Sequence, residues 1–255
     1  MGAGLFPPPF LFWQVRPVIR AILFDVDDTL YSYQTAHPYG CEAVRSYAVH
    51  TLGMDGGDFD VRIQETMAAY WKRMGSNCAA VHNRLIRFQQ LLEPAGLPLR
   101  HAPIMDRLYW DTLLAHMEPA PGIAEAMDDL KARGLRIGVG TNMTADWQFE
   151  KLTRLGLLDR VDFVVSSEEA GVEKPDAGLF LLCAEKAWCS PGECVFVGDS
   201  LGHDIAGALS AGMRAVWYRP AAGDGDRVPE GAVVIRSMAE LPALADAWCR
   251  GGEGQ

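Results

Sequence analysis

The chain has 255 residues, of which 49% are hydrophobic and 22% are charged, and its formal net charge at pH 7 is −10. A chain of this length can bury a sizeable core, either as one large domain or as one domain with an insertion. The acidic balance argues against electrostatic binding to a nucleic acid polymer or to an anionic membrane. We therefore expect an ordinary soluble globular protein.

Cysteine usage and the first residues indicate the cellular compartment. The six cysteines contain no Cys-x-x-Cys pair and several lie in apolar surroundings, which indicates reduced core cysteines rather than disulfides or zinc ligands. Residues 5–13 are apolar but contain three consecutive prolines, and the stretch is too short to span a bilayer. We interpret residues 1–17 as an N-terminal tail and predict a cytoplasmic protein.

An apolar run over residues 18–24 leads directly into Asp25, Asp27 and Thr29. The run is short, branched and aromatic, which is typical of a buried strand. In open parallel sheets, ligands bind at the carboxyl edge, where such a strand ends. On an extended chain, Asp25 and Asp27 would point the same way, and their charges would repel unless a cation or a shared proton intervenes. Taken alone, such a pair is more often the cap of a turn or of the following helix.

Residues 31–118 contain no convincing strand and predict several amphipathic helices. Apolar residues recur at helical spacing over residues 58–74 and again over residues 78–92. Pro94, Gly96 and Pro98 then interrupt the pattern, and a further helix is predicted over residues 104–117.

From residue 119 onward, predicted helices and strands alternate. The predicted helices cover residues 123–133, 145–155, 177–188, 202–211 and 238–248, and the strands cover residues 135–139, 163–165, 194–197 and 214–217. This alternation predicts an α/β fold with a three-layer, Rossmann-like parallel sheet. We therefore expect a core of residues 18–30 and 119–250, with residues 31–118 as an inserted helical cap over the carboxyl edge.

Four polar clusters follow strands of this predicted sheet. They are Asp25-x-Asp27-x-Thr29, Thr141-Asn142, Lys174-Pro175, and Gly198-Asp199 with Asp204. Together, and in this order, they resemble the four motifs of the haloacid dehalogenase superfamily, in the branch with a helical cap after the first motif. The resemblance covers nearly the whole chain, from residue 18 to about residue 244.

The resemblance implies an aspartyl-phosphate mechanism that uses Mg²⁺. Asp25 would be the nucleophile and a metal ligand, and Asp199 a further ligand, since oxygen donors suit this ion. Asp27 would bind the metal through its backbone carbonyl, protonate the leaving oxygen, and later deprotonate the attacking water. A model Asp titrates near ~3.9, so this acid needs its pKa raised by about three units at neutral pH.

The resemblance also assigns supporting roles. Thr141 and the backbone amide of Asn142 would bind the transferring phosphoryl group, and Lys174 would balance the charge of Asp25 and phosphate. Asp204 would hold a metal-bound water or orient Lys174, and Thr29 completes the first motif. Taken alone, Lys174 would more often be a surface lysine, Thr141-Asn142 a helix cap, and Asp204 an acidic residue at a helix start.

Other polar residues near the motifs carry weaker predictions. Asp28 is assigned no role, because that position varies in the family, and His203 has a solvated side chain as its ordinary reading. Four residues of the predicted cap are candidates for substrate contacts, although an ordinary surface role is the better reading: His37, His82, Asn83 and Arg84.

The second aspartate distinguishes between the reactions of the superfamily. Asp27 argues against a dehalogenase, because a halide leaves without a proton, and phosphonate-cleaving relatives also replace this residue. The runs around Tyr31 and over residues 169–176 look most like nucleotidases and sugar phosphatases. We therefore expect a Mg²⁺-dependent phosphatase for a small phosphorylated metabolite, such as a nucleoside monophosphate, a sugar phosphate or phosphoglycolate. The alternative functions are a phosphosugar mutase and a non-catalytic binding protein. We expect the oligomeric state to be a monomer or a homodimer.

Overall fold

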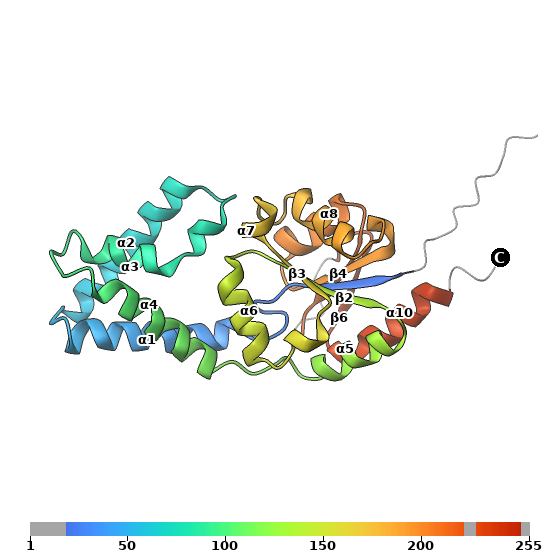
Figure 1. The fold of residues 1–255 in the computed structure, drawn as a ribbon, viewed down its shortest axis with the longest axis horizontal. Coiled ribbons are helices and arrows are strands. Elements are labelled where there is room, and N and C mark those ends of the chain that lie inside the picture. Colours follow the sequence, from blue (N-terminus) through green and yellow to red (C-terminus); the bar gives the residue numbers. More distant parts are fainter. Residues whose placement is uncertain (1–18, 222–227, 251–255) are drawn as a thin grey trace, which may run out of the picture.

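The computed structural model describes residues 19–221 and 228–250, and its centre is a six-stranded parallel sheet in the order β3-β2-β1-β4-β5-β6 (Figure 1). The strands are β1 Ala21–Phe24, β2 Arg136–Thr141, β3 Phe163–Ser166, β4 Cys194–Gly198, β5 Arg214–Tyr218 and β6 Ala232–Ile235. The strand order reverses between β1 and β4, which pair with Phe24 opposite Val197. Such a switch point is where open α/β sheets bind ligands.

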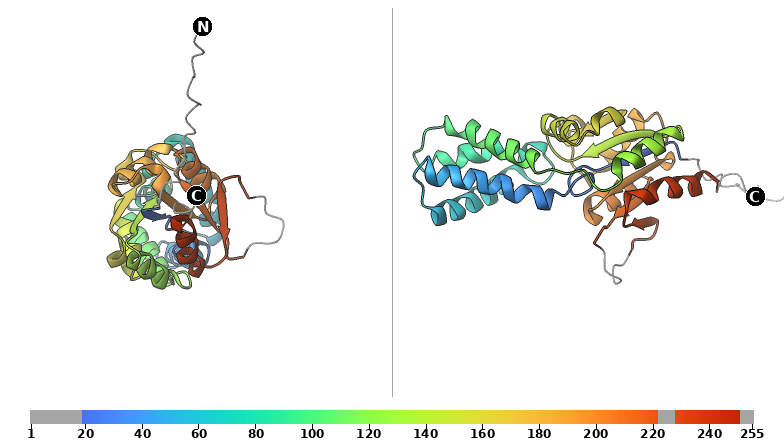
Figure 2. Two further views of the ribbon diagram at one scale, coloured as in Figure 1. Left: turned by 90° about the vertical axis from the view of Figure 1, so that its right-hand side faces the viewer. Right: turned by 90° about the horizontal axis from the view of Figure 1, so that it is seen from below.

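Helices cover both faces of the sheet (Figures 1 and 2). Ile22 and Phe24 of β1 face one core, while Leu23 between them faces the other, because successive strand side chains point to opposite faces. The first core takes side chains of α5 (Ile123–Ala132), α6 (Ala145–Arg154) and α10 (Leu241–Arg250); the second takes those of α8 (Ala177–Lys186) and α9 (Ala206–Ser210). The predicted three-layer α/β fold is confirmed.

The helices between β1 and β2 form a helical insertion, residues 33–115, that extends from one end of the sheet (Figures 1 and 2). They are α1 Tyr33–His50, α2 Gly56–Met74, α3 Arg84–Leu92 and α4 His101–Ala115. Close packing of α1 on α4 requires Gly40, because a Cβ there would lie 2.9 Å from the Tyr109 ring. The side chains of Met105, Trp110 and Leu113 on α4 are fully buried.

One predicted helix differs from the structure, and one strand of the sheet was not predicted. The helix predicted over residues 78–92 is instead a 3₁₀ turn, Ala79–His82, followed by α3, because Asn83 is extended and its side chain accepts a hydrogen bond from the Ile86 amide at 3.1 Å. An asparagine that caps a helix in this way ends the preceding one. Strand β6, at the edge of the sheet, was not predicted, although it is as short and as apolar as β1.

The predictions about membranes, cysteines and the tail have different outcomes. Among the described helices, none has the length and apolar character needed to cross a bilayer. All six cysteines are free; Cys183 and Cys194 are buried and Cys41 is exposed. The predicted tail, residues 1–17, lies outside the described residues.

Candidate active site

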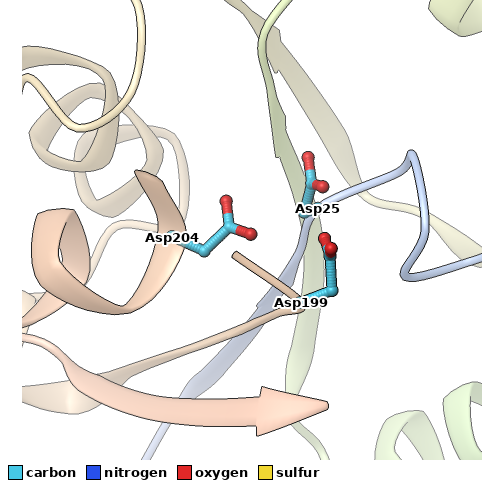
Figure 3. A group of neighbouring side chains, drawn as sticks. All are labelled: Asp25, Asp199 and Asp204. Atoms are coloured by element: carbon cyan, nitrogen blue, oxygen red, sulfur yellow. The ribbon is translucent and has the colours of Figure 1, made fainter. Parts of the chain in front are cut away.

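Three carboxylates meet at the carboxyl edge of the sheet, at the switch point between β1 and β4 (Figure 3). Oxygen atoms of Asp25, Asp199 and Asp204 lie within 4.8 Å of one another. Asp25 follows β1 and Asp199 follows β4, and the Asp25 amide continues the strand pairing with a 2.9 Å bond to Val197 O. Gly198 lets Asp204 approach, since a Cβ there would lie 2.4 Å from the Asp204 carboxylate.

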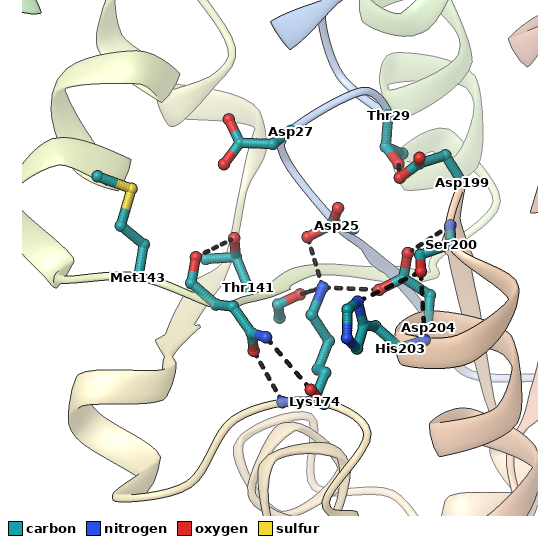
Figure 4. Close-up of polar contacts among 12 residues, drawn as sticks. Asp25, Asp27, Thr29, Thr141, Met143, Lys174, Asp199, Ser200, His203 and Asp204 are labelled. Carbon is teal, nitrogen blue, oxygen red and sulfur yellow. Dashed lines mark hydrogen bonds and ion pairs between the residues drawn. The ribbon is translucent and has the colours of Figure 1, made fainter. Parts of the chain in front are cut away.

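Lys174 connects two of these carboxylates from below (Figure 4). Its Nζ donates to Asp25 Oδ1 at 2.5 Å, to Asp204 Oδ1 at 2.7 Å and to Gly140 O at 3.2 Å. The Asn142 side chain fixes the loop that carries it, accepting from the Lys174 amide at 2.8 Å and donating to Lys174 O at 3.3 Å. Two roles were expected for Asp204, and its contact with Lys174 Nζ is the geometry that the second role, orienting Lys174, requires.

The ionisation of this cluster follows from its burial. Burial raises the pKa of Asp25 to about 8, against the opposing charge of Lys174. Burial and the negative charge of Asp204 raise the pKa of Asp199 to about 6. Burial disfavours the Lys174 ammonium, but Asp204 and Asp25 outweigh it and raise the pKa of Lys174. Among the described residues, Lys174 pairs with two of the three carboxylates, and this excess of oxygen ligands and negative charge fits a bound Mg²⁺ ion.

Asp27 does not point toward this cluster. Asp25 bonds Lys174, whereas Asp27 bonds Lys151, so the two carboxylates have different cationic partners (Figure 4). Lys151 Nζ lies 2.6 and 2.9 Å from the two Asp27 oxygens, and the Tyr31 hydroxyl donates to Oδ1. Burial alone would raise the pKa of Asp27, but the charge and hydrogen bonds of Lys151 lower it, so this carboxylate is ionised.

Lys151 and Gln148, both on α6, were missed in the sequence. Both side chains are fully buried, and Lys151 Nζ lies over the rings of Trp110 at 5.5 Å and Tyr31 at 5.7 Å. A helical lysine is ordinarily solvated, so its residue type gave no signal. The one available signal was its three-residue spacing from Gln148, which places both side chains on one helix face.

The remaining predicted residues lie around the same edge. The Thr141 hydroxyl, at the end of β2, accepts a 2.8 Å hydrogen bond from Gln148 Nε2 and donates to Asn142 O at 3.4 Å. The Thr29 hydroxyl donates to Asp199 Oδ1 at 3.5 Å. The structure therefore brings together the side chains of all four motifs, and Asp27 and Thr141 both contact side chains of α6.

Residues with weaker predictions lie at the margin of the site. Asp28 Oδ1 accepts from the Gln34 amide at 3.1 Å, and the exposed His203 lies beside the Ser200 hydroxyl. His37 Nδ1 lies 2.6 Å from the Tyr109 hydroxyl, inside the helical insertion.

The helical insertion contacts the sheet domain directly beside Lys174. Asn77 Oδ1 accepts a hydrogen bond from the Glu173 amide at 2.6 Å, and His82 Nε2 lies 3.0 Å from Glu173 Oε1. Glu173 is buried and also accepts from the Ser167 hydroxyl at 3.2 Å. The insertion is thus held against the loop that positions Lys174.

A parallel α/β sheet with an acidic cluster and a buried lysine at its switch point is a site that suits a divalent cation and an anionic ligand. The chain belongs to the family described as haloacid dehalogenase-like hydrolase, which matches residues 19–212.

Relatives of similar sequence carry phosphatase names, and the similar solved structures include both a phosphatase and a 2-haloacid dehalogenase. The chain is 36% identical to a ribulose-1,5-bisphosphate 5-phosphatase of Halopiger xanaduensis, over 78% of this chain and 84% of that protein. It is also 36% identical to a glyceraldehyde 3-phosphate phosphatase of Methanopyrus kandleri, over 79% and 84%. The crystal structure of a HAD phosphatase from Thermococcus onnurineus matches with a TM-score of 0.70 and 27% identity, over 89% and 97%.

Proposed function

We propose that this protein is a Mg²⁺-dependent phosphatase that hydrolyses a small phosphomonoester through a phosphorylated Asp25. The observation that carries the proposal is the position of Asp25, which lies at the switch point with Lys174 Nζ at 2.5 Å. The phosphatase names of relatives at 36% identity support the reaction class. Six free cysteines fit the cytoplasm as its location.

Asp25 attacks phosphorus as the ionised carboxylate and splits hydrolysis into two steps. Its raised pKa shows that burial opposes ionisation, while Lys174 favours it. Asp25, Asp199 and the Asp27 carbonyl would hold Mg²⁺, which supplies the positive charge that ionised Asp25 and an incoming phosphate both require. Thr141 and the Asn142 amide bind the phosphoryl oxygens.

Asp27 serves as acid and then as base. Its pair with Lys151 keeps it ionised before substrate binds, which suits the later removal of a proton from water. The first step needs a protonated Asp27. We infer that the doubly charged phosphate, a like charge close to Asp27, raises its pKa enough for protonation in the complex.

Residues 31–118 act as the cap in this proposal, with residues 18–30 and 119–250 as the catalytic core. The contacts of Asn77 and His82 with Glu173 support this division, because they hold the insertion over the carboxyl edge. Sugar phosphates are the proposed substrates, by analogy with the names of the relatives, and nucleoside monophosphates are the second class to test.

The test is release of inorganic phosphate from a panel of phosphorylated metabolites with Mg²⁺. We expect turnover of at least one sugar phosphate at a rate far above that of p-nitrophenyl phosphate. Conversion of a sugar 1-phosphate to its 6-phosphate without free phosphate would instead identify a mutase. No turnover on the whole panel by folded, Mg²⁺-loaded protein would contradict the proposal.

Removal of the metal should stop the reaction. We expect EDTA to abolish phosphate release and excess Mg²⁺ to restore it, because in the described part of the chain Lys174 pairs with two of the three carboxylates and leaves an excess of negative charge. Phosphate release is measured before and after dialysis, with circular dichroism to show that the fold is kept. An unchanged rate in EDTA would remove the metal from the account.

Substitution of Asp27 should slow substrates according to their leaving groups. We expect Asp27→Asn to reduce kcat about 10²- to 10⁴-fold on an alkyl phosphate, whose leaving oxygen needs a proton. The loss on p-nitrophenyl phosphate should be much smaller, since nitrophenolate leaves unprotonated. Equal losses on both substrates would contradict the acid role, and Asp28→Asn, beside it in the chain, is the matched control.

A further inference from the structure

The helical insertion contains two buried arginines that have no acidic partner. Arg84 and Arg87 are 8% and 9% exposed, and within the described parts of the chain neither forms an ion pair with a carboxylate. Arg84 donates to the Tyr33 hydroxyl at 2.8 Å and to His82 O at 3.3 Å, while Arg87 donates to Val81 O at 2.5 Å. The Nε of Arg87 is buried without a hydrogen-bond partner.

Two neighbouring arginines without an ion pair, such as Arg84 and Arg87, are unusual in a protein interior. Arginine stays protonated, and a buried charge is costly unless it is paired. The Arg84 guanidinium lies over the rings of Tyr109 at 4.3 Å and Trp110 at 4.4 Å. Burial disfavours the Arg84 cation, but the tyrosine hydroxyls outweigh it and raise the pKa of Arg84, so the cost falls on Arg87. Burial and the charge of Arg84 lower the pKa of Arg87 to about 10, so the two cations disfavour each other. An anion bound here would relieve both effects.

These arginines lie between the catalytic carboxylates and a cavity. Trp110 carries Arg84 on its ring and also contacts Lys151, the partner of Asp27. The charge of Arg84 reaches Asp27, where it helps to lower the pKa. On the other side, a cavity of about 480 Å³ between α1, α2 and α3 is lined by both arginines. Arg84 thus lies on the Asp27 side of the site, where the leaving oxygen of a substrate would be.

We propose that Arg84, supported by Arg87 and Tyr33, binds a second anionic group on the leaving part of the substrate. This inference rests on the proposed phosphatase function. The planar guanidinium matches a carboxylate or a phosphate with two parallel hydrogen bonds, so either group fits the site. The enzyme accordingly selects phosphomonoesters that carry two separated anionic groups.

The test compares substrates that share a carbon skeleton. Ribulose 1,5-bisphosphate is paired with ribulose 5-phosphate, and 3-phosphoglycerate with glyceraldehyde 3-phosphate. In at least one pair, kcat/KM for the member with two anionic groups should exceed that of its partner by about ten-fold or more. The first pair reports a phosphate and the second a carboxylate as the preferred group. No preference in either pair would overturn the proposal.

Variants of Arg84 test whether this residue causes the preference for substrates with two anionic groups. Arg84→Met keeps an apolar stem in the core and should bring the ratio of the preferred pair close to one, mainly through KM. Arg84→Lys keeps the charge but loses the planar fork, so an intermediate ratio is expected, and it decides the test if Arg84→Met fails to fold. Arg45→Gln is the matched control, because Arg45 lines the same cavity but already pairs with Asp60 at 2.9 Å. A wild-type ratio in Arg84→Met would overturn the proposal.

Failure of the phosphatase function can be separated from failure of this site. If no substrate releases phosphate, calorimetric titration of the same ligands still measures the site. Tighter binding of the bisphosphate or phosphoglycerate, lost in Arg84→Met, supports the site without the reaction. Equal binding of both members of each pair contradicts it.

Discussion

The Asp25→Asn variant should lose phosphate release by about a thousand-fold or more, because the amide has no ionised oxygen to attack phosphorus. Asp25 is the carboxylate that Lys174 contacts at 2.5 Å, next to Asp199 and Asp204. Rates are measured with Mg²⁺ on the best substrate of the panel, with long incubations to detect residual turnover. Turnover within ten-fold of the wild-type rate would remove Asp25 from the nucleophile role.

The same variant should fold, and its stability tests the buried charge independently. The pKa of Asp25 is raised to about 8 by burial, so the metal-free folded state binds a proton more tightly than the unfolded chain. Unfolding free energy in EDTA should therefore fall as pH rises from about 4 to about 8. Asp25→Asn should remove part of that slope and be at least as stable at pH 8. An unchanged slope would show that Asp25 is not the group responsible.

The Lys174→Met variant should lose both activity and stability. Lys174 is 4% exposed and pairs with Asp25 and Asp204, so its removal leaves two buried carboxylates without their cation. Breaking a buried pair in this way costs about 3–5 kcal/mol. Urea unfolding in EDTA at pH 7.5 measures this loss, and phosphate release should fall in parallel because Asp25 loses the charge that favours its ionised form.

The pH dependence of that loss follows from the pKa of Lys174, which its two partners raise against burial. Stabilisation by a cation whose pKa is raised is present at neutral pH and is lost only as pH rises through the raised value. At acid pH, protonation of Asp25 relieves the unpaired charge, so the deficit of Lys174→Met should shrink below its value at pH 7.5. Lys186→Met is the control: Lys186 pairs with Glu169 at the surface, and its loss should cost about 1 kcal/mol or less. Equal deficits in the two variants would contradict the buried pairing.

The sheet was predictable because its strands are short apolar runs separated by helical patterns. Buried parallel strands such as β1 have no polar face, so the run ending at Phe24 was visible without any alignment. Three of the four motifs were found because each lies at the end of such a strand, at residue types that oxygen chemistry requires, whereas Lys174 follows the short helix Ser167–Ala170. Strand β6 is an apolar run of the same length that was not predicted; unlike β1, it lies at the edge of the sheet and is only partly buried.

The polar interior of the site was not predictable from one sequence. Lys151 and Arg84 are charged residues in helices, and nothing local distinguishes them from solvated ones. Their burial is a tertiary property, produced by Trp110 of α4, which contacts both side chains. The pairing of Asp27 with Lys151 was missed for the same reason.

The central claim is that a side-chain oxygen of Asp25 forms a bond to phosphorus during turnover. A crystal structure of the wild-type protein with beryllium fluoride and Mg²⁺ tests it most directly, since this fluoride mimics a phosphoryl group on a carboxylate. We predict tetrahedral density continuous with an Asp25 oxygen, close to Lys174 and Thr141. Density joined to any other side chain, with Asp25 unmodified, would contradict the account.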